Sequence, residues 1–544
     1  MFCIQCEQTV RTSESSGCQS QKGVCGKTAE TSDLQDLLIT VLAGLSGWII
    51  EGKAQQLETE NAQRFIPFAL FSTLTNVNFD PERIVSFAIQ ATQLRDELAK
   101  QLGKNIDHPL ANLSLKGNDV ATLSKQASNF SFNATGHINK DTLGLQLLNL
   151  YGLKGAAAYY EHAQALGQFS DELSFEIVKH LAWLGSTPTN DNELLDNAMA
   201  IGQLNFKIMQ LLELAETNSF GHPIPTEVNR KPTKGKAILV SGHDLNDLKL
   251  LLEQTEGTGI NVYTHGELLP AHGYPLLKQY THLKGNYGGA WQMQQREFMR
   301  FPGPILMTSN CIIDPTLGAY QDRIWTRSMV GWPGVKHITD DNFSPIIEQA
   351  KTMIGFTQTE IEESITVGFG RETLLGASDS LLSMFGDKSL RHAFLVGGCD
   401  GRSVGRDYYS EFTQSVPKDC VVLTLGCAKY RFNDQAFGDI NGLPRLIDIG
   451  QCNDSFAAIM LAVNLAEKLG CSVNDLPLSI VLSWFEQKAI VVLLTLLSLG
   501  VKNIYTGPQM PAFLTPNLLK ILTHQYGIKA ISDVESDMKK MLVA

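Results

Sequence analysis

The stretch KAILVSGHDL, residues 236–245, decides the fold class of the second half of this 544-residue chain. A short aliphatic run, Lys236–Ser241, is followed by Gly242 and then by polar residues. Apolar runs of this length that alternate with helical segments are typical of α/β units built on a parallel sheet. Eight further runs follow the same pattern, at residues 260–264, 304–308, 365–368, 392–396, 420–425, 445–449, 479–483 and 502–505.

The part of the chain before this stretch has a helical pattern. Between about residues 28 and 220, apolar residues recur at helical spacing, and no comparable strand-like runs occur. Ser32 to Gln35 forms a capping-box pattern, and Asp80-Pro81 is typical of an N-cap followed by proline in the first helical turn. The fold class is therefore predicted to be multidomain, α plus α/β.

Three domains are expected from these patterns. The first, residues 1–225, carries the N-terminal cysteines and an all-α helical bundle, and a Pro- and Gly-containing linker near residues 223–236 ends it. Two α/β domains, 226–355 and 356–544, fit the remaining length better than one very wide sheet.

Composition limits the function classes. The chain is 43% hydrophobic and 18% charged, which is ordinary for a globular protein, and its net charge of −12 argues against a nucleic-acid partner. No secretory signal pattern opens the sequence, and the apolar stretch 489–499 is too short to span a bilayer. A cytoplasmic protein with no membrane association is expected.

Four of the ten cysteines lie within the first 25 residues, at Cys3, Cys6, Cys18 and Cys25. A CxxC pair with two later cysteines can surround one metal centre with four thiolates. A Cys₄ zinc site uses similar spacing, so spacing alone leaves iron–sulfur and zinc equally favoured. A disulfide is disfavoured in a reducing compartment.

A second set of residues shares one structural position, just beyond a predicted strand. Ligands bind outside the carboxyl ends of the strands in open α/β sheets, so side chains placed there can converge. One such residue alone is usually a loop residue, a helix cap or a small core residue. The repeated placement favours a second metal site, made by Cys311, Cys399, Cys427, Cys452, His243, Glu267 and Glu486. Cys420 and Cys471 lack this position, and a structural role is expected for both.

Mixed ligation has a chemical meaning. Thiolates favour iron–sulfur chemistry, whereas imidazole and carboxylate suit iron with oxygen or nitrogen ligands. A centre held by both types would be asymmetric, with exchangeable positions on the side of His243, Glu267 and Glu486 where a small substrate could bind.

These residues lie in long motifs that resemble the hybrid cluster protein (hydroxylamine reductase) family. The motifs are MFCIQCEQT, CGKTAETSDLQDLL, LVSGHDL, YTHGELLPAHGYP, MTSNCIIDP, FLVGGCDG, LTLGCAKYRF, IGQCNDS and SWFEQKA. The resemblance covers essentially the whole chain. It implies an α-helical domain followed by two Rossmann-like α/β domains, with distant similarity to nickel–iron carbon monoxide dehydrogenases.

The resemblance also implies cofactors. Cys3, Cys6, Cys18 and Cys25 would hold a [2Fe–2S] cluster, as in the longer-spaced variant, with [4Fe–4S] as the alternative. The seven dispersed residues would hold a hybrid [4Fe–2O–2S] iron–sulfur–oxygen cluster, and Cys399 matches the cysteine that carries a persulfide.

The implied reaction is reduction of hydroxylamine to ammonia and water, with nitric oxide reduction as the related physiological activity. His243, Glu267 and Glu486 would act at the substrate, with Glu486 as the first choice of proton donor. Lys488 would stabilise negative charge, although a solvated helix lysine is an equally open interpretation.

The implied partner is a separate NADH-oxidising flavoprotein, since GFG at 368–370 lacks the third glycine of a dinucleotide fingerprint. A monomer or homodimer is expected. Two alternatives stay open: a nitric oxide sensor or protein S-nitrosylation protein with the same clusters, and a metallohydrolase with a structural zinc site.

Overall fold

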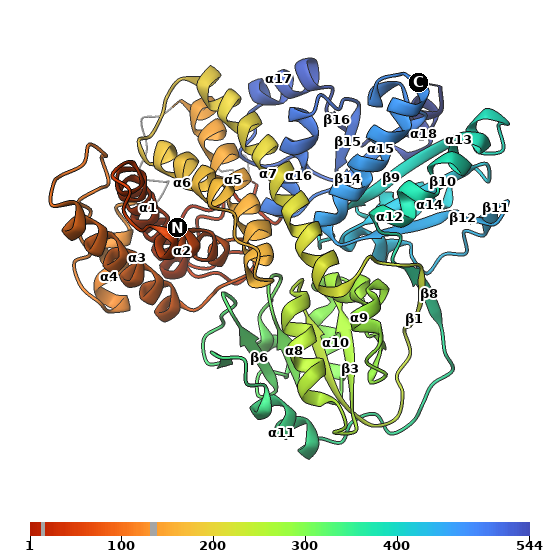
Figure 1. Ribbon diagram of the computed structural model, residues 1–544, viewed down its shortest axis with the longest axis horizontal. Helices are drawn as coiled ribbons and strands as arrows, with labels where there is room; N and C mark the ends of the chain where they lie inside the picture. The colour runs from red at the N-terminus through yellow and green to blue at the C-terminus, as the bar shows by residue number, and fades with distance from the viewer. Residues whose placement is uncertain (12–16, 131–138, 544) are drawn as a thin grey trace.

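The computed structural model describes residues 1–11, 17–130 and 139–543 (Figure 1). Its N-terminal region is helical and lies to the left in Figure 1, as the sequence pattern predicted. Its described residues form the helices α1 (Ala29–Ala54), α2 (Glu60–Ser72), α3 (Pro81–Leu102), α4 (Val120–Ala127), α5 (Lys140–Ala165), α6 (Asp171–Gly185) and α7 (Asp191–Phe220).

Two predicted helix starts have different outcomes. The start at Asp80-Pro81 is confirmed, because the Asp80 side chain accepts a hydrogen bond from the Glu82 N–H, 3.0 Å away. The start at Ser32 is wrong. Helix α1 begins earlier, with Thr28 as its N-cap, and Gln35 lies buried inside the protein instead of closing a capping box.

The first parallel sheet has six strands in the order β4-β3-β2-β5-β6-β7. Every neighbouring pair is parallel, so all the carboxyl ends lie at one edge. The strands are β2 (Lys236–Ser241), β3 (Ile260–His265), β4 (Leu283–Asn286), β5 (Ile305–Met307), β6 (Ile324–Arg327) and β7 (Lys336–Ile338). Its helices are α8 (Leu245–Thr255), α9 (Pro275–Lys278), α10 (Gln294–Arg300) and α11 (Ser344–Thr352).

The second parallel sheet also has six strands, in the order β13-β10-β9-β14-β15-β16. Its strands are β9 (His392–Gly398), β10 (Cys420–Leu425), β13 (Leu446–Gly450), β14 (Leu478–Ser483), β15 (Ile504–Gly507) and β16 (Lys529–Ala530). The accompanying helices are α12 (Arg371–Gly376), α13 (Ser378–Gly386), α14 (Asp407–Gln414), α15 (Ser455–Leu469), α17 (Pro516–Tyr526) and α18 (Val534–Val543).

One predicted strand does not belong to either parallel sheet. The run at 365–368 forms β8 (Ser364–Val367), which pairs antiparallel with β1 (Thr226–Asn229). The predicted linker at 223–236 therefore contains a strand, and this ribbon ties the beginning of the first α/β region to the beginning of the second. A small hairpin, β11 (Asp439–Ile440) and β12 (Leu443–Pro444), completes the strands.

Helix α16 (Gln487–Ser498) comes from the second α/β region but packs against α5 and α7 of the helical region (Figure 1). Glycines allow this close approach. At Gly155 an added Cβ would overlap the Gln487 carbonyl oxygen and lie 2.9 Å from Val491 Cγ1, and at Gly202 it would overlap the Leu494 carbonyl. The residues of 489–499 are thus mostly part of a packed helix, as their length predicted.

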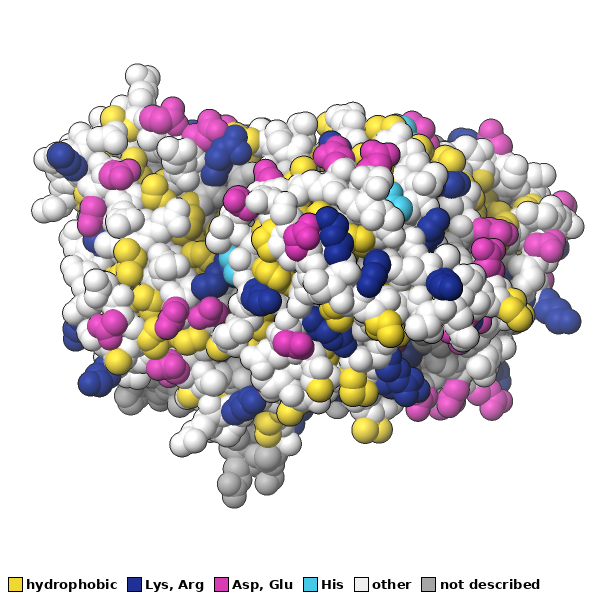
Figure 2. All heavy atoms as spheres, turned by 90° about the horizontal axis from the view of Figure 1, so that it is seen from below, with side chains coloured by type: hydrophobic (Ala, Val, Ile, Leu, Met, Phe, Trp, Pro, Cys, Tyr) yellow, Lys and Arg dark blue, Asp and Glu magenta, His cyan; other side chains and the backbone are white. Residues whose placement is uncertain are grey.

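Helix α1 is long and apolar enough, by length and composition, to cross a membrane, and 72% of its most apolar window is buried inside the protein. Its packing against α3 and α6 is that of a core helix. On the face shown in Figure 2, Lys and Arg side chains are interspersed with Asp and Glu side chains.

Substituting Gly155 with alanine is expected to lower stability by about 1–3 kcal/mol, because the methyl group must displace the first turn of α16. Thermal or denaturant unfolding measures the effect. The matched control is Gly376→Ala, at a helical glycine with no atom within 4 Å of the added Cβ, which should leave stability unchanged or slightly raised. Equal unfolding midpoints for the two variants would contradict the packing described.

Candidate metal centres

The seven dispersed residues all lie just beyond, or at, the carboxyl ends of parallel strands. In the first sheet, His243 follows β2, Glu267 follows β3 in the 3₁₀ helix Gly266–Gly273, and Cys311 follows β5. The second sheet contributes the other four, which are Cys399 after β9, Cys427 after β10, Cys452 after β13 and Glu486 after β14.

Hydrogen bonds join the two carboxyl edges directly. The Gln451 side-chain amide donates to the carbonyls of His243 and Glu267, at 3.1 and 2.7 Å. The Cys452 N–H donates to Glu267 Oε2 at 3.0 Å. Candidate ligands from both sheets therefore surround one buried point.

His243, Glu267 and Cys452 form the tightest group. Their ligand atoms all lie within 4.8 Å of one another, and all three residues are buried. The His243 Nε2 atom is 3.8 Å from Glu267 Oε2. One ion could contact an imidazole, a carboxylate and a thiol at this point.

The surroundings of His243 favour the neutral imidazole, with Nε2 directed toward the site. Its Nδ1 atom lies 3.1 Å from the Asn310 carbonyl and 3.0 Å from Ser309 Oγ, which leaves Nε2 directed toward the site. Burial and the nearby Lys488 charge hold the pKa of His243 well below its ordinary value. A neutral imidazole with its second nitrogen held by a carbonyl is the usual state of a metal-binding histidine.

Three further cysteines lie close to this group. Cys311, Cys427 and the half-buried Cys399 belong to one small apolar cluster with Trp291 and Phe485. Burial raises the pKa of each thiol, and nearby carboxylates raise it further: Glu486 for Cys311 and Cys399, and Glu267 for Cys427. Thiols and carboxylates this close together need a positive charge to ionise, so the residues fit a metal centre.

Glu486 and Lys488 lie at the start of α16. Glu486 is its N-cap and accepts a hydrogen bond from the Lys488 N–H, 3.1 Å away. Burial raises the pKa of Glu486, whereas the Lys488 charge lowers it. The interpretation of Lys488 as a solvated helix lysine is wrong: its side chain is fully buried, and Nζ donates to Asn310 Oδ1 at 2.8 Å.

The structure adds residues that the motifs did not indicate. His162 and Tyr159, both on α5, lie beside the site. The His162 ring stacks on His243, with centroids 5.9 Å apart, and its Nε2 is 3.4 Å from Lys488 Nζ. Burial and the nearby Cys452 raise the pKa of the Tyr159 hydroxyl. Only their helical periodicity was visible in the sequence, which identifies core residues and gives no signal of a site.

The N-terminal cysteines form a second group, and one of them, Cys6, also belongs to the apolar cluster of Cys311 and Cys427. Cys3 and Cys18 pair through two backbone hydrogen bonds of 3.2 and 2.9 Å. Burial raises the pKa of Cys3, Cys6 and Cys25, and the charges of neighbouring cysteines raise it further. Residues 12–16, between Cys6 and Cys18, lie outside the described residues.

A buried arginine connects the two groups. Arg406 forms an ion pair with Glu7, the residue after Cys6, with Nη2 2.7 Å from Oε2. The same guanidinium donates to the Trp484 carbonyl at 2.7 Å and to Ser483 Oγ. In addition, the Glu7 N–H donates to the Phe485 carbonyl at 3.0 Å. The N-terminal segment is thus anchored beside Glu486.

Of the two cysteines outside both groups, Cys420 is buried in the core of the second sheet, as a structural role requires. Cys471 is exposed after the Gly470 C-cap of α15, and its structural role stays a prediction.

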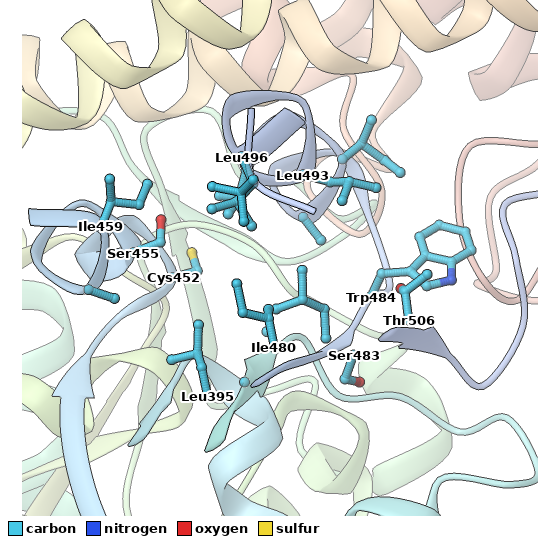
Figure 3. A pocket seen from close by; sticks show the side chains of 18 of the residues that line it. Leu395, Cys452, Ser455, Ile459, Ile480, Ser483, Trp484, Leu493, Leu496 and Thr506 are labelled. Atoms are coloured by element: carbon cyan, nitrogen blue, oxygen red, sulfur yellow. The ribbon is translucent and has the colours of Figure 1, made fainter. Parts of the chain in front are cut away.

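An apolar cavity of about 210 Å³ reaches the site of the seven dispersed residues (Figure 3). Aliphatic side chains of α15, α16 and the second sheet line most of it, including Leu395, Ile480 and Leu496. Cys452 and Cys399 also line its wall. The cavity therefore offers small apolar molecules a dry space next to two candidate ligands.

Comparison with known proteins agrees with this architecture. The chain is 60% identical to the hydroxylamine reductases of Salmonella schwarzengrund (strain CVM19633) and Escherichia coli (strain SE11), and each comparison covers 100% of both chains. Carbon monoxide dehydrogenase IV from Carboxydothermus hydrogenoformans has a similar fold, with a TM-score of 0.57 and 15% identity over 99% of this chain and 92% of that one.

A carbon monoxide dehydrogenase from Thermococcus sp. AM4 gives a TM-score of 0.54 at 16% identity, covering 99% of this chain and 90% of that one. At this identity the likeness concerns the fold alone. The Prismane/CO dehydrogenase family matches residues 1–539. With this match, two parallel sheets that meet at their carboxyl edges and an N-terminal helical region, the chain belongs to the Prismane/CO dehydrogenase family.

Proposed function

We propose that this chain is a hydroxylamine reductase, converting NH₂OH, two electrons and two protons into NH₃ and H₂O. The observation that carries the proposal is the meeting of His243, Glu267 and Cys452 at one buried point between the sheets, in a chain 60% identical to hydroxylamine reductases. The domains we propose are 1–225, 226–355 and 356–544, a helical bundle followed by two Rossmann-like domains.

The proposed cofactors follow the two groups of residues. Cys3, Cys6, Cys18 and Cys25 hold a [2Fe–2S] cluster, with [4Fe–4S] as the alternative. His243, Glu267, Cys311, Cys399, Cys427, Cys452 and Glu486 hold a hybrid [4Fe–2O–2S] cluster, with Cys399 as a persulfide. When bound, the hybrid cluster supplies Lewis acidity and electrons to the N–O bond.

The protein's own residues have separate roles at the substrate. Glu486 is buried, and burial raises its pKa, so it can carry a proton toward the leaving oxygen. The Lys488 ammonium, held by Asn310, stabilises developing negative charge in a site from which water is excluded. Neutral His243 presents Nε2 while Asn310 and Ser309 fix its ring.

Electrons enter through the N-terminal cysteine group, because Cys3 and Cys25 are partly exposed there. The donor we propose is an NADH-oxidising flavoprotein. The working form is a cytoplasmic monomer or homodimer.

Nitric oxide reduction, 2 NO plus two electrons and two protons giving N₂O and H₂O, is a second candidate activity of the same site. The cavity beside Cys399 and Cys452 favours it, since a dry apolar space suits a small, weakly polar molecule better than hydroxylamine.

Anaerobically purified protein tests the proposal. Iron and acid-labile sulfide together with multiple turnovers of hydroxylamine, driven by a chemical reductant, are the expected results. Zinc without sulfide would favour the metallohydrolase. Iron–sulfur clusters that react once without turnover would favour the nitric oxide sensor or S-nitrosylation protein.

Replacing Glu486 with glutamine is expected to lower kcat for hydroxylamine by about 100-fold or more, because the amide cannot deliver a proton. The signal of the N-terminal cluster should persist in electron paramagnetic resonance. The matched control is Glu213→Gln, at a buried glutamate that pairs with Arg371 and is not among the seven candidate ligands, and it should retain full kcat. Full activity of E486Q would remove this residue from the mechanism.

Ala458 on α15 lines the cavity that reaches Cys452, so Ala458→Phe should fill it. Nitric oxide turnover is expected to fall at least tenfold, with a smaller change for hydroxylamine. The control, Leu461→Phe on the same helix, lines only a neighbouring apolar cavity and should leave both rates close to wild type. An equal loss of both activities in A458F would show that the cavity does not select nitric oxide.

A further inference from the structure

Two lysines are buried beside the N-terminal cysteine group. Lys27 is 2% exposed and follows Cys25 by two residues, and Lys154 is 3% exposed on α5. A buried ammonium is costly unless an anion compensates it. The neighbours of both side chains therefore indicate what balances their charge.

Neutral oxygen atoms are the hydrogen-bond acceptors of both ammonium groups. Lys154 Nζ donates to Gln5 Oε1 and to the Thr73 carbonyl, both at 3.2 Å. Lys27 Nζ donates to Gln35 Oε1 at 2.5 Å. Within the described ranges, 1–11, 17–130 and 139–543, neither lysine forms an ion pair with a carboxylate.

Other buried cations are compensated differently. Arg406 pairs with Glu7, and Lys429 pairs with Asp448 in the middle of β13. Arg323 and Arg445 are buried too, and the acceptors printed for them among the described residues are backbone carbonyls. What distinguishes Lys27 and Lys154 is therefore their position beside the N-terminal cysteines.

The thiols of the N-terminal group and the Asp36 carboxylate are the sources of negative charge near Lys154. Gln5, the acceptor for Lys154, lies between Cys3 and Cys6 in the chain. Burial lowers the pKa of Lys154 to about 7, the Lys27 charge lowers it too, and Asp36 and Cys3 oppose this.

We propose that Lys27 and Lys154 are positioning charges that balance the four-thiolate centre and raise its reduction potential. The inference rests on the proposed iron–sulfur centre at Cys3, Cys6, Cys18 and Cys25. One-electron reduction adds a negative charge to the centre. A buried ammonium stabilises that added charge more strongly than a solvated one, because the local dielectric constant is low.

The test is the reduction potential of each centre in the iron-loaded protein. Lys154→Met keeps the side-chain length and removes the charge, and Lys27→Met repeats the test from another segment. Redox titration followed by electron paramagnetic resonance should show the N-terminal centre at least tenfold harder to reduce, a shift of 59 mV or more to negative potential for a one-electron couple. The centre proposed at the seven dispersed residues should keep its wild-type reduction potential.

Two controls separate charge from packing. Lys179→Met removes an exposed ammonium from α6, and Asn149→Leu alters a buried neutral side chain on α5, the helix of Lys154. Both should leave the two potentials unchanged. A shift in N149L as large as in K154M would overturn the proposal in favour of packing.

Loss of a centre, or an unchanged potential, also distinguishes a charge effect from its alternatives. Loss of the N-terminal centre alone from K154M or K27M would support the proposal, because the thiolates would lack their counter-charge. An intact centre at unchanged or more positive potential in both variants, or loss of both centres together, would overturn it. Absence of any reducible N-terminal centre in the wild-type protein would instead contradict the proposed function.

Discussion

The hydrogen bonds that join the carboxyl edges of the two parallel sheets hold the candidate site together. The Gln451 side-chain amide donates hydrogen bonds to the backbone carbonyls of His243 and Glu267, which follow strands of the first sheet. The Cys452 N–H donates a hydrogen bond to the Glu267 carboxylate. Parallel strands direct their following loops to one edge, so the meeting of two such edges concentrates side chains from distant parts of the sequence. The buried carboxylates and thiols found there can ionise together only beside a positive charge, which a bound metal would supply.

Many strands of the two sheets, and the candidate ligands that follow them, could be predicted from the sequence because each is marked by a short local pattern. An aliphatic run followed by glycine and then a cysteine, histidine or glutamate indicates both a strand and the end at which its ligand lies. Strands β2 and β10 have the predicted bounds. Strands β4, β6 and β7 were missed because they are short and carry polar residues such as Lys284, Thr326 and His337. Their partners, not their own composition, fix them in the sheet.

Other features depend on tertiary contacts that no local pattern contains. The antiparallel pairing of β1 with β8 joins segments more than 130 residues apart, so 365–368 resembles any other strand in the sequence. Lys488 stands at the start of an amphipathic run, where a solvated lysine is the ordinary expectation. Its burial follows from the packing of α16 against α5, which Gly155 permits. His162 and Tyr159 could not be identified as site residues from the sequence either, because nearly every residue of their helix is buried.

The insertion of α16 into the helical region has a consequence for biogenesis. Cys3 and the N-terminal helices are synthesised first, yet the helix that carries Glu486 and Lys488 must dock against both α5 and α7 to complete their packing. A nascent chain that has not yet released α16 exposes the apolar faces of α5 and α7 and lacks two residues of the site. The site at the carboxyl edges is therefore complete only after α16 has docked, and surface of this kind exposed in a partly made chain is prone to aggregation.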